Sequence, residues 1–344
     1  MRLTLFINTE HRPNDDLGRR LAEHVEQVRL ARQLGYEGIS VGQHMSFGAS
    51  AWFPPLEMLA RLSAVDTEMA LSTSMLILPW YHPLHVAQQA ALLDAMCGGR
   101  LTLGLAPGWQ QDESRILGLD HGKRIARFVE GVELIRRLFA EDQVTFTGKH
   151  FQADKLALAL KPARKPRPPM WFGGSVTAAV ERVARLSDTS LGDAWVSSAH
   201  LLHDVVIGQA KAYRAALAAA GKPPPAEVPL IRNIIVAPDR ETAIREAAPA
   251  LSESYRLFGK WGLFTKVVGS GKEQLELGEL IRDRVIVGSP EECAGDLIRL
   301  GREAGCNRLI ARMQWMGMEQ RLVLRSIEML ARDVMPIVRT ALAA

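Results

Sequence analysis

Cysteine is scarce in this chain of 344 residues, which has three, Cys97, Cys293 and Cys306, and no Cys-x-x-Cys spacing. An odd number of widely spaced cysteines gives neither a disulfide framework nor a zinc-binding pattern, so we expect reduced core residues. Long apolar runs are also missing: no segment approaches the ~20 residues of a membrane span, and the first residues hold too short an apolar stretch for a signal peptide. These absences predict a cytoplasmic protein without membrane association.

The sequence has no strong excess of one charge. Its formal net charge is +4, and the basic residues are scattered apart from one proline-rich run over residues 161–167. Proteins that bind nucleic acids normally carry a dense basic patch, so we expect no nucleic-acid partner. The content of 47% hydrophobic and 23% charged residues is ordinary for a globular protein, and the length allows a large core around a cofactor.

Short, mostly apolar segments alternate with helical patterns along the chain. The segments are residues 3–8, 36–41, 71–78, 100–106, 170–172, 193–196, 228–237 and 308–313. Such runs are typical of strands that are buried on both faces of a parallel sheet. Eight strands in alternation with helices favour an α/β fold of the (β/α)8 TIM barrel type over a doubly wound sheet. We predict one barrel domain over residues 1–344, because the proline-rich run is too short for a flexible linker.

The clearest unit lies between residues 70 and 119. Two apolar runs bracket a helix that starts at Pro83, a residue favoured in the first helical turn, and Gly98-Gly99 then ends it. This order predicts a strand, a crossover helix and a parallel strand, a connection that is right-handed almost without exception.

Two segments depart from the simple alternation. Residues 144–151 alternate in polarity around a glycine, which predicts a β-hairpin excursion. Residues 255–284 have weak periodicity and five glycines, and the slightly longer segment 252–284 shows no usable pattern. We expect an inserted loop there, before the last βα unit. The final helix, from about residue 319 to the end, should be interrupted near Pro336.

The active site of such a barrel lies at the carboxyl ends of its strands. This rule selects His44, Ser74-Met75, Ala106 to Trp109, Gly173-Gly174-Ser175, Trp195 and Gln314-Trp315. The set is rich in tryptophan, methionine and small residues, and it lacks the cluster of histidine and carboxylate ligands that a metal site needs. A large, flat, apolar ligand would suit these residues.

Two positions allow both a chemical and a structural interpretation. Gly173-Gly174-Ser175 precedes a helix, so its amides could bind a phosphate or it could be a tight turn; the residues alone favour neither. His44 ends a strand, where a histidine is more often packed than catalytic, although its ordinary titration range suits proton exchange near neutrality. Trp109 follows a glycine at a strand end, which favours a place in the pocket lining.

Several motifs occur in an order that resembles the bacterial luciferase-like family of flavin-dependent oxidoreductases and monooxygenases. They are Leu78-Pro79-x-x-His82-Pro83, Gly98-Gly99-Arg100, Gly104-x-x-x-Gly108-Trp109, residues 287–292, residues 314–318 and residues 333–336. Together they extend the resemblance across nearly the whole chain. No Rossmann fingerprint is present, so a tightly held dinucleotide is not implied.

The resemblance implies an FMN site and assigns residues to it. The family places the flavin phosphate at the Gly173-Gly174-Ser175 turn, with the hydroxyls of Ser175 and Thr177 and the amide of Val176 as candidates. Ser74-Met75 matches a non-prolyl cis peptide beneath the flavin ring. The remaining candidates for cofactor binding are Ala106, Gly108, Trp109 and Trp195.

Two positions differ from the family pattern. His44 matches a catalytic acid/base, but Gln43 stands where the family has a glutamate that could raise the basicity of the histidine. Pro107 stands where bacterial luciferase has an arginine that touches the flavin phosphate. Because proline cannot do this, the deazaflavin F420 stays open as the cofactor.

The resemblance implies a monooxygenase in which reduced FMN and O2 form a C4a-(hydro)peroxyflavin that oxidises a small organic substrate. A separate flavin reductase would supply the reduced FMN, unless the flavin stays bound. The alternatives are F420-dependent hydride transfer on the same fold and a non-catalytic flavin-binding subunit, with a metal-dependent hydrolase disfavoured for want of ligands. The family also dimerises through the helices expected at residues 54–64 and 83–97, which implies a homodimer.

Overall fold

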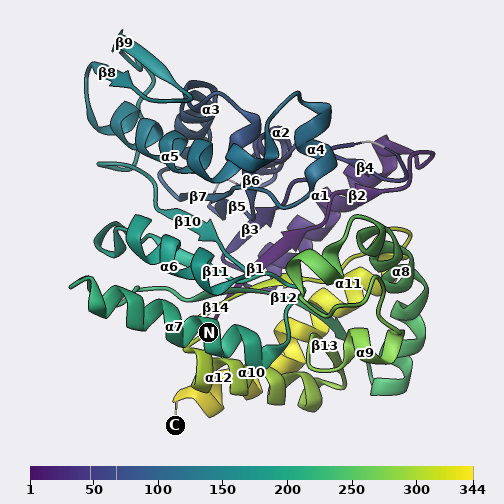
Figure 1. Ribbon diagram of the computed structural model, residues 1–344. Helices are drawn as coiled ribbons and strands as arrows, with labels where there is room; N and C mark the ends of the chain where they lie inside the picture. The colour runs from purple at the N-terminus through teal and green to yellow at the C-terminus, as the bar shows by residue number, and fades with distance from the viewer. Residues whose placement is uncertain (47, 67, 344) are drawn as a thin grey trace.

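Parallel strands form a barrel in the computed structural model, which describes residues 1–46, 48–66 and 68–343 (Figure 1). The eight barrel strands are β1 (Arg2–Ile7), β3 (Gly38–Val41), β5 (Ala70–Thr73), β7 (Leu101–Ala106), β10 (Met170–Gly173), β11 (Ala194–Val196), β12 (Pro229–Val236) and β14 (Arg308–Arg312). Successive strands pair in parallel from β1 to β11, and β14 pairs with both β1 and β12. The barrel closes where β11 contacts β12. The predicted (β/α)8 fold is confirmed.

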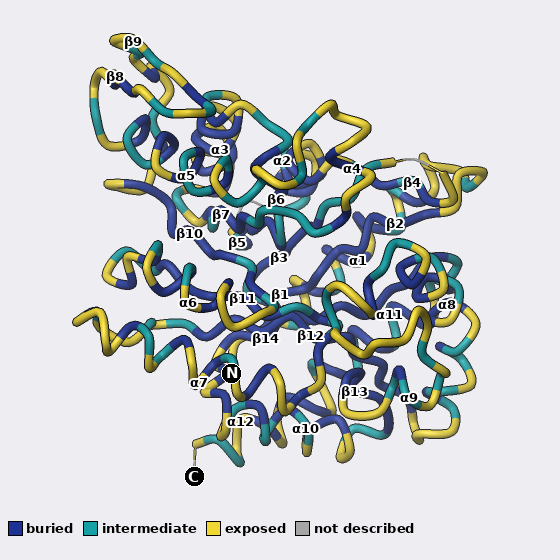
Figure 2. Tube along the Cα trace, viewed as in Figure 1, coloured by how far each residue is buried: buried dark blue, intermediate teal, exposed yellow. Residues whose placement is uncertain are grey.

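Helices cover the outside of the barrel. They are α1 (Leu17–Gln33), α2 (Pro55–Ser63), α3 (Pro83–Met96), α5 (Arg124–Ala140), α6 (Thr177–Leu186), α7 (His203–Ala219), α8 (Arg240–Lys260), α10 (Pro290–Ala304), α11 (Gln320–Met329) and α12 (Met335–Ala343). Figure 2 shows buried strands at the centre and exposed positions on the outer turns. None of the described helices is both long and apolar enough to cross a membrane.

The unit around α3 follows its sequence signals closely. The ring of His82 accepts a hydrogen bond from the amide of Leu84 (3.2 Å) and so caps the helix, with Pro83 in the first turn. Gly98 and Gly99 follow its end with φ of +58° and +79°, a backbone region that glycine adopts without strain. The predicted helix boundaries are confirmed within one residue.

The strand predicted over residues 71–78 is not continuous. β5 ends at Thr73, the Ser74–Met75 peptide bond is cis as the resemblance implied, and β6 (Leu76–Ile77) then pairs with β7. A Cβ atom at Gly104 of β7 would lie 1.8 Å from the carbonyl oxygen of Thr73. Only glycine therefore permits the close approach of the two backbones at this bend.

The two excursions are present with different boundaries. The hairpin consists of β8 (Val144–Thr147) and β9 (Gln152–Leu156), which extend away from the barrel at the upper left of Figure 1. The insertion begins later than expected, because α8 continues to Lys260; a short π-helical turn (Leu263–Val267) and α9 (Leu277–Ile281) follow. The expectation of a loop from residue 255 was therefore wrong for the first six residues.

Several elements were not predicted. They are the small pair β2 (Glu10–His11) and β4 (Ala51–Trp52), the short helix α4 (Gln111–Ile116), α7, and β13 (Val285–Gly288), which pairs in parallel with the second half of β12. At the C-terminus, a π-helical turn (Leu330–Val334) joins α11 to α12. The expected interruption near Pro336 thus lies just before that residue, which occupies the first turn of α12.

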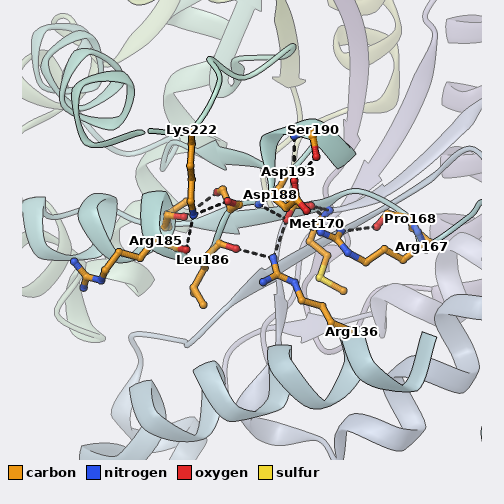
Figure 3. Close-up of polar contacts among 12 residues, drawn as sticks. Arg136, Arg167, Pro168, Met170, Arg185, Leu186, Asp188, Ser190, Asp193 and Lys222 are labelled. Atoms are coloured by element: carbon orange, nitrogen blue, oxygen red, sulfur yellow. Dashed lines mark hydrogen bonds and ion pairs between the residues drawn. The ribbon is translucent and has the colours of Figure 1, made fainter. Parts of the chain in front are cut away.

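A buried carboxylate ties together the starts of β10 and β11 (Figure 3). The two oxygens of Asp193 accept a fork of hydrogen bonds from Arg167 (2.7 and 2.8 Å), and one of them accepts another from Arg136 (2.8 Å). The amides of Met170 (2.8 Å) and Asp188 (2.9 Å) also donate to Asp193. Because these groups come from α5, the proline-rich connector, β10 and the turn before β11, one side chain fixes the relative positions of all four.

We expect Asp193→Asn to lower the free energy of unfolding by about 3 kcal/mol or more, because it leaves the buried guanidinium of Arg167 and the half-buried one of Arg136 without a counter-charge. Urea unfolding followed by circular dichroism measures this change. The matched control is Asp112→Asn, which breaks an exposed pair with Arg115 and should cost less than about 1 kcal/mol. Equal effects of the two substitutions would show that Asp193 is no structural centre.

Candidate active site

A cavity of about 390 Å³ opens at the carboxyl ends of the barrel strands. Its wall includes residues at the ends of the barrel strands, together with Phe258 of α8 and Lys266 and Val267 of the insertion. Ten of the predicted site residues line it: His44, Ser74, Met75, Ala106, Gly108, Trp109, Gly173, Gly174, Ser175 and Val176. The barrel rule and this cavity therefore select the same end of the fold.

Four predicted residues do not line the cavity: Gln314 and Trp315, which are buried, and Trp195 and Thr177. Trp195 is fully buried beneath the lining, where its indole nitrogen donates to the carbonyl oxygen of Gly174 (2.9 Å). Thr177 is exposed at the start of α6 and does not line the cavity. Trp195 thus supports the glycine turn from below and does not line the cavity, and the phosphate contact expected of the Thr177 hydroxyl stays a prediction.

The centre of the cavity floor is the Ser74–Met75 bend. The hydroxyl of Ser40 donates to the hydroxyl of Ser74 (2.6 Å), which ties the bend to β3. The side chain of Met75 lies close to two backbone positions without side chains, because a Cβ atom at Gly104 or Gly173 would come within 3.2 or 3.3 Å of it. The floor is therefore apolar and made largely of backbone and one thioether.

His44 is paired with a carboxylate that the sequence interpretation missed. Its Nδ1 lies 2.9 Å from Oε1 of Glu113, and the same oxygen accepts a hydrogen bond from the amide of Met45 (2.9 Å). The side chain of Glu113 is 2% exposed, and Gln110 caps the α4 helix that carries it. A carboxylate at Nδ1 favours the tautomer with the proton on that nitrogen, which leaves Nε2 as a proton acceptor.

Gln43 has a structural role in place of the glutamate expected from the family pattern. Its side-chain oxygen accepts a hydrogen bond from the amide of Ile77 (2.8 Å), and its amide nitrogen donates to the hydroxyl of Tyr81. It therefore links the end of β3 to β6. The inference that replacing the glutamate removes the carboxylate beside His44 was wrong, because Glu113 supplies one from a distant segment.

Aromatic rings surround the His44–Glu113 pair. The ring centroids of Trp52, Trp261, Phe258 and Trp109 lie 4.9, 5.3, 5.9 and 6.0 Å from that of His44. These rings leave the side chain of His44 16% exposed, and the lower local dielectric strengthens its interaction with the carboxylate.

Positive charge gathers at the end of the cavity formed by β7 and β10. Arg124, Arg182 and Lys266 line this end together with the Gly173–Val176 turn. The turn leads into α6, whose N-cap residue Val176 provides no side-chain hydrogen bond to the first amides. Burial, with the nearby charges of Arg185 and Arg124, lowers the pKa of Arg182. The described lining contains no aspartate or glutamate, so this end suits an anion such as phosphate.

The three cations were not selected from the sequence. Arg124 is held by hydrogen bonds from its guanidinium to the carbonyl oxygens of Gly108 (3.1 Å) and His121 (2.9 Å). Arg124 begins α5, Arg182 lies in the middle of α6 and Lys266 lies in the insertion, so none of the three follows a strand end. They supply the positive charge that Pro107 cannot.

A second polar group lies across the barrel, near β14. His200 and Arg312 line the cavity there, and Nδ1 of His200 lies 2.8 Å from the hydroxyl of Tyr255. Burial, followed by the charge of Arg312, lowers the pKa of His200 well below its ordinary value, so this histidine is neutral. Both residues lie at or just after a strand end, so the barrel rule could have selected them.

Comparison with known proteins identifies the family of this site. A family model described as luciferase-like monooxygenase matches residues 1–308. A curated relative, 4-hydroxyprotoasukamycin monooxygenase of Streptomyces nodosus subsp. asukaensis, is 29% identical over 96% of this chain and 90% of its own length. The oxygenase component of the flavin-dependent trigonelline monooxygenase of Acinetobacter baylyi is 26% identical over 76% of this chain and 72% of its length.

Solved structures share the fold. The oxygenating constituent of 3,6-diketocamphane monooxygenase from Pseudomonas putida, in complex with FMN, has a TM-score of 0.79 at 17% identity, with 98% of each chain covered. An F420-dependent secondary alcohol dehydrogenase has a TM-score of 0.76 at 19% identity, with 98% of this chain and 99% of that chain covered. With the family model matched over most of the sequence, the chain belongs to the luciferase-like monooxygenases, a family of flavin-dependent enzymes.

Proposed function

We propose that the chain is a flavin-dependent monooxygenase that uses reduced FMN and O2 to oxidise a small organic substrate. The observation that carries this proposal is a cavity with an apolar floor, positive charge at one end, and a histidine–carboxylate pair on its wall. An isoalloxazine ring suits the floor, and a phosphate suits the positively charged end, the phosphate seat. The monooxygenase relatives support the same reaction class.

The phosphate of FMN would lie at the Gly173–Val176 turn. Its ligands would be the amides at the start of α6, the hydroxyl of Ser175, and the cations Arg124, Arg182 and Lys266. The helix end and the cations act together, because both favour negative charge at this point.

His44 would manage protons next to the flavin ring. When bound, the flavin supplies the redox chemistry between O2 and the substrate. Nε2 of His44 would accept or return a proton, while Glu113 holds the ring in one tautomer. Trp52, Trp109 and Phe258 keep bulk water away from this exchange.

The reduced flavin would come from a separate reductase, as for a relative that is described as an oxygenase component.

An F420-dependent hydride transfer is the second candidate. It is favoured by Pro107 and by the positive charge of Arg124, Arg182 and Lys266, and an F420-dependent enzyme shares the fold. A non-catalytic flavin-binding subunit would have no need of the His44–Glu113 pair. We also propose that residues 1–344 form a single barrel domain, which carries the whole site.

We expect isothermal titration to show binding of FMN, or of its reduced form alone under anaerobic conditions. Riboflavin lacks the phosphate, so its affinity should be lower than that of FMN by a factor of about ten or more, since charge-assisted hydrogen bonds to phosphate are lost. Binding of F420 alone would assign the enzyme to hydride transfer. Binding of none of these compounds would contradict a flavin site.

We expect His44→Ala to lower turnover about a hundredfold, in the range of general acid–base catalysis, with the affinity for FMN unchanged. The assay uses the substrate that an oxygen-consumption screen identifies. Glu113→Gln should also lower turnover, since it removes the charge that orients the ring, and Glu113→Asp should restore part of it. The control is His85→Ala, an exposed histidine on α3. Unchanged turnover in His44→Ala would make His44 a structural residue.

We also propose a homodimer through α2 and α3. On α3, the apolar side chains of Leu92 and Met96 stand one turn apart and are 47% and 39% exposed. A partner copy would cover them, so light scattering should give twice the monomer mass. Leu92→Glu with Met96→Lys should shift the mass toward the monomer. A wild-type monomer at micromolar concentration would contradict the proposal.

A further inference from the structure

The cavity has a polar end that the proposed FMN site does not use. Around the barrel, β14 lies four strands from β7, and β1 lies four strands from β10. The ends of β1 and β14 are therefore diametrically opposite the phosphate seat. A flavin held at that seat would extend across the floor toward this side, where a second molecule has to enter.

Arg312 dominates this opposite end. Its side chain is 5% exposed, and its guanidinium lies between the rings of Phe6 and Phe258, 5.8 and 5.9 Å from their centroids. Nη2 lies 3.6 Å from Oε2 of Glu10, which is an ion pair but too long for a hydrogen bond. Within the described residues, Nε and Nη2 have no hydrogen-bond partner. A buried guanidinium with unused donors is costly unless a ligand satisfies them.

Two further polar atoms in the same part of the cavity are buried and unpaired among the described residues. They are the hydroxyl of Ser197, just after β11, and the side-chain oxygen of Asn8, just after β1. The amide nitrogen of Asn8 donates to the carbonyl oxygen of Gln314 (2.9 Å), which fixes the orientation of the group. Ser197 thus offers an unused hydroxyl to this space, whereas the unused oxygen of Asn8 is an acceptor that suits a hydrogen-bond donor of the ligand and not a carboxylate oxygen.

The electrostatic balance at this end favours a negative ligand. Arg232 and Arg284 lie behind the lining and donate to backbone carbonyls, including those of Leu201 and His200. Glu10 is the acidic partner of Arg312, and burial raises its pKa while the charge of Arg312 opposes the rise. The charges of Arg312, Arg284 and Arg232 all act on His200 at this end, whereas the one carboxylate paired with Arg312 is that of Glu10.

We propose that this end binds the carboxylate, or a similar anionic oxygen group, of the organic substrate, with Nε and Nη2 of Arg312 as the donors. A guanidinium presents such donors in a planar fork that matches two carboxylate oxygens. The apolar part of the substrate would lie along Phe6 and Ile231, between Arg312 and the flavin ring. The inference rests on the proposed function, because it names small organic acids as the substrate class of the same site.

The test is isothermal titration of the wild-type protein, with and without FMN, using acetate, hexanoate and benzoate and the corresponding primary amides. Each pair has nearly the same shape and differs in charge. At least one carboxylate should bind about tenfold more tightly than its amide, since a charge-assisted fork is lost in the amide. Arg312→Met should remove this preference with the affinity for FMN unchanged, and Arg312→Lys should reduce it.

The matched control is Arg256→Met, because Arg256 is exposed on α8, and it should keep the full preference. If circular dichroism shows that Arg312→Met is unfolded, the reduced preference of Arg312→Lys decides. The proposal is overturned if no carboxylate is preferred, if the preference survives loss of Arg312, or if Arg312→Met weakens FMN binding, since the arginine would then hold the cofactor. A carboxylate preference without any flavin binding would instead refute only the proposed function.

Discussion

The buried carboxylate of Asp193 is the interaction on which the geometry of the site depends most. It fixes the beginnings of β10 and β11 against Arg167 and Arg136. Each strand is only three or four residues long, so its carboxyl end follows rigidly from its beginning. Those ends lead into the Gly173–Val176 turn and the segment that carries Ser197 and His200. An ion pair at the closed end of the barrel therefore sets the positions of groups at the open end, as expected for a fold that separates stability from catalysis.

Sequence reasoning succeeded where a backbone rule decides the outcome. Apolar runs bounded by glycine and proline located the barrel strands, because strands buried on both faces leave little choice of residue. Once the strands were placed, their carboxyl ends selected His44 and Gly173 without knowledge of any side-chain contact. Trp195 and Thr177 do not line the cavity, because a strand end or a helix start does not determine on which side of the backbone a side chain lies.

The charged groups of the site could not be located in the same way. Glu113 stands on a six-residue helix, too short for a periodic pattern, and its contact with His44 spans 69 residues. Lys266 lies in a π-helical turn of the insertion, where no pattern was usable. Arg312 was visible at the end of the last strand. That its donors stay unused follows from its distance of 3.6 Å to Glu10, a residue of another segment. Such pairings arise from closure of the barrel and leave no local signal in the sequence.

Two substitutions against the family pattern show what the site requires. Gln43 stands where the family has a carboxylate next to the histidine, and Pro107 stands where bacterial luciferase has a cation at the flavin phosphate. In both cases the charge is present but comes from another part of the chain: Glu113 on α4, and Arg124 and Arg182 on α5 and α6. Because an electrostatic interaction depends on the distance between charges and not on the element that carries them, helices near the barrel mouth can supply it equally well. The backbone turns around the cavity have no such freedom, since at Gly104 a single Cβ atom would collide with the neighbouring strand.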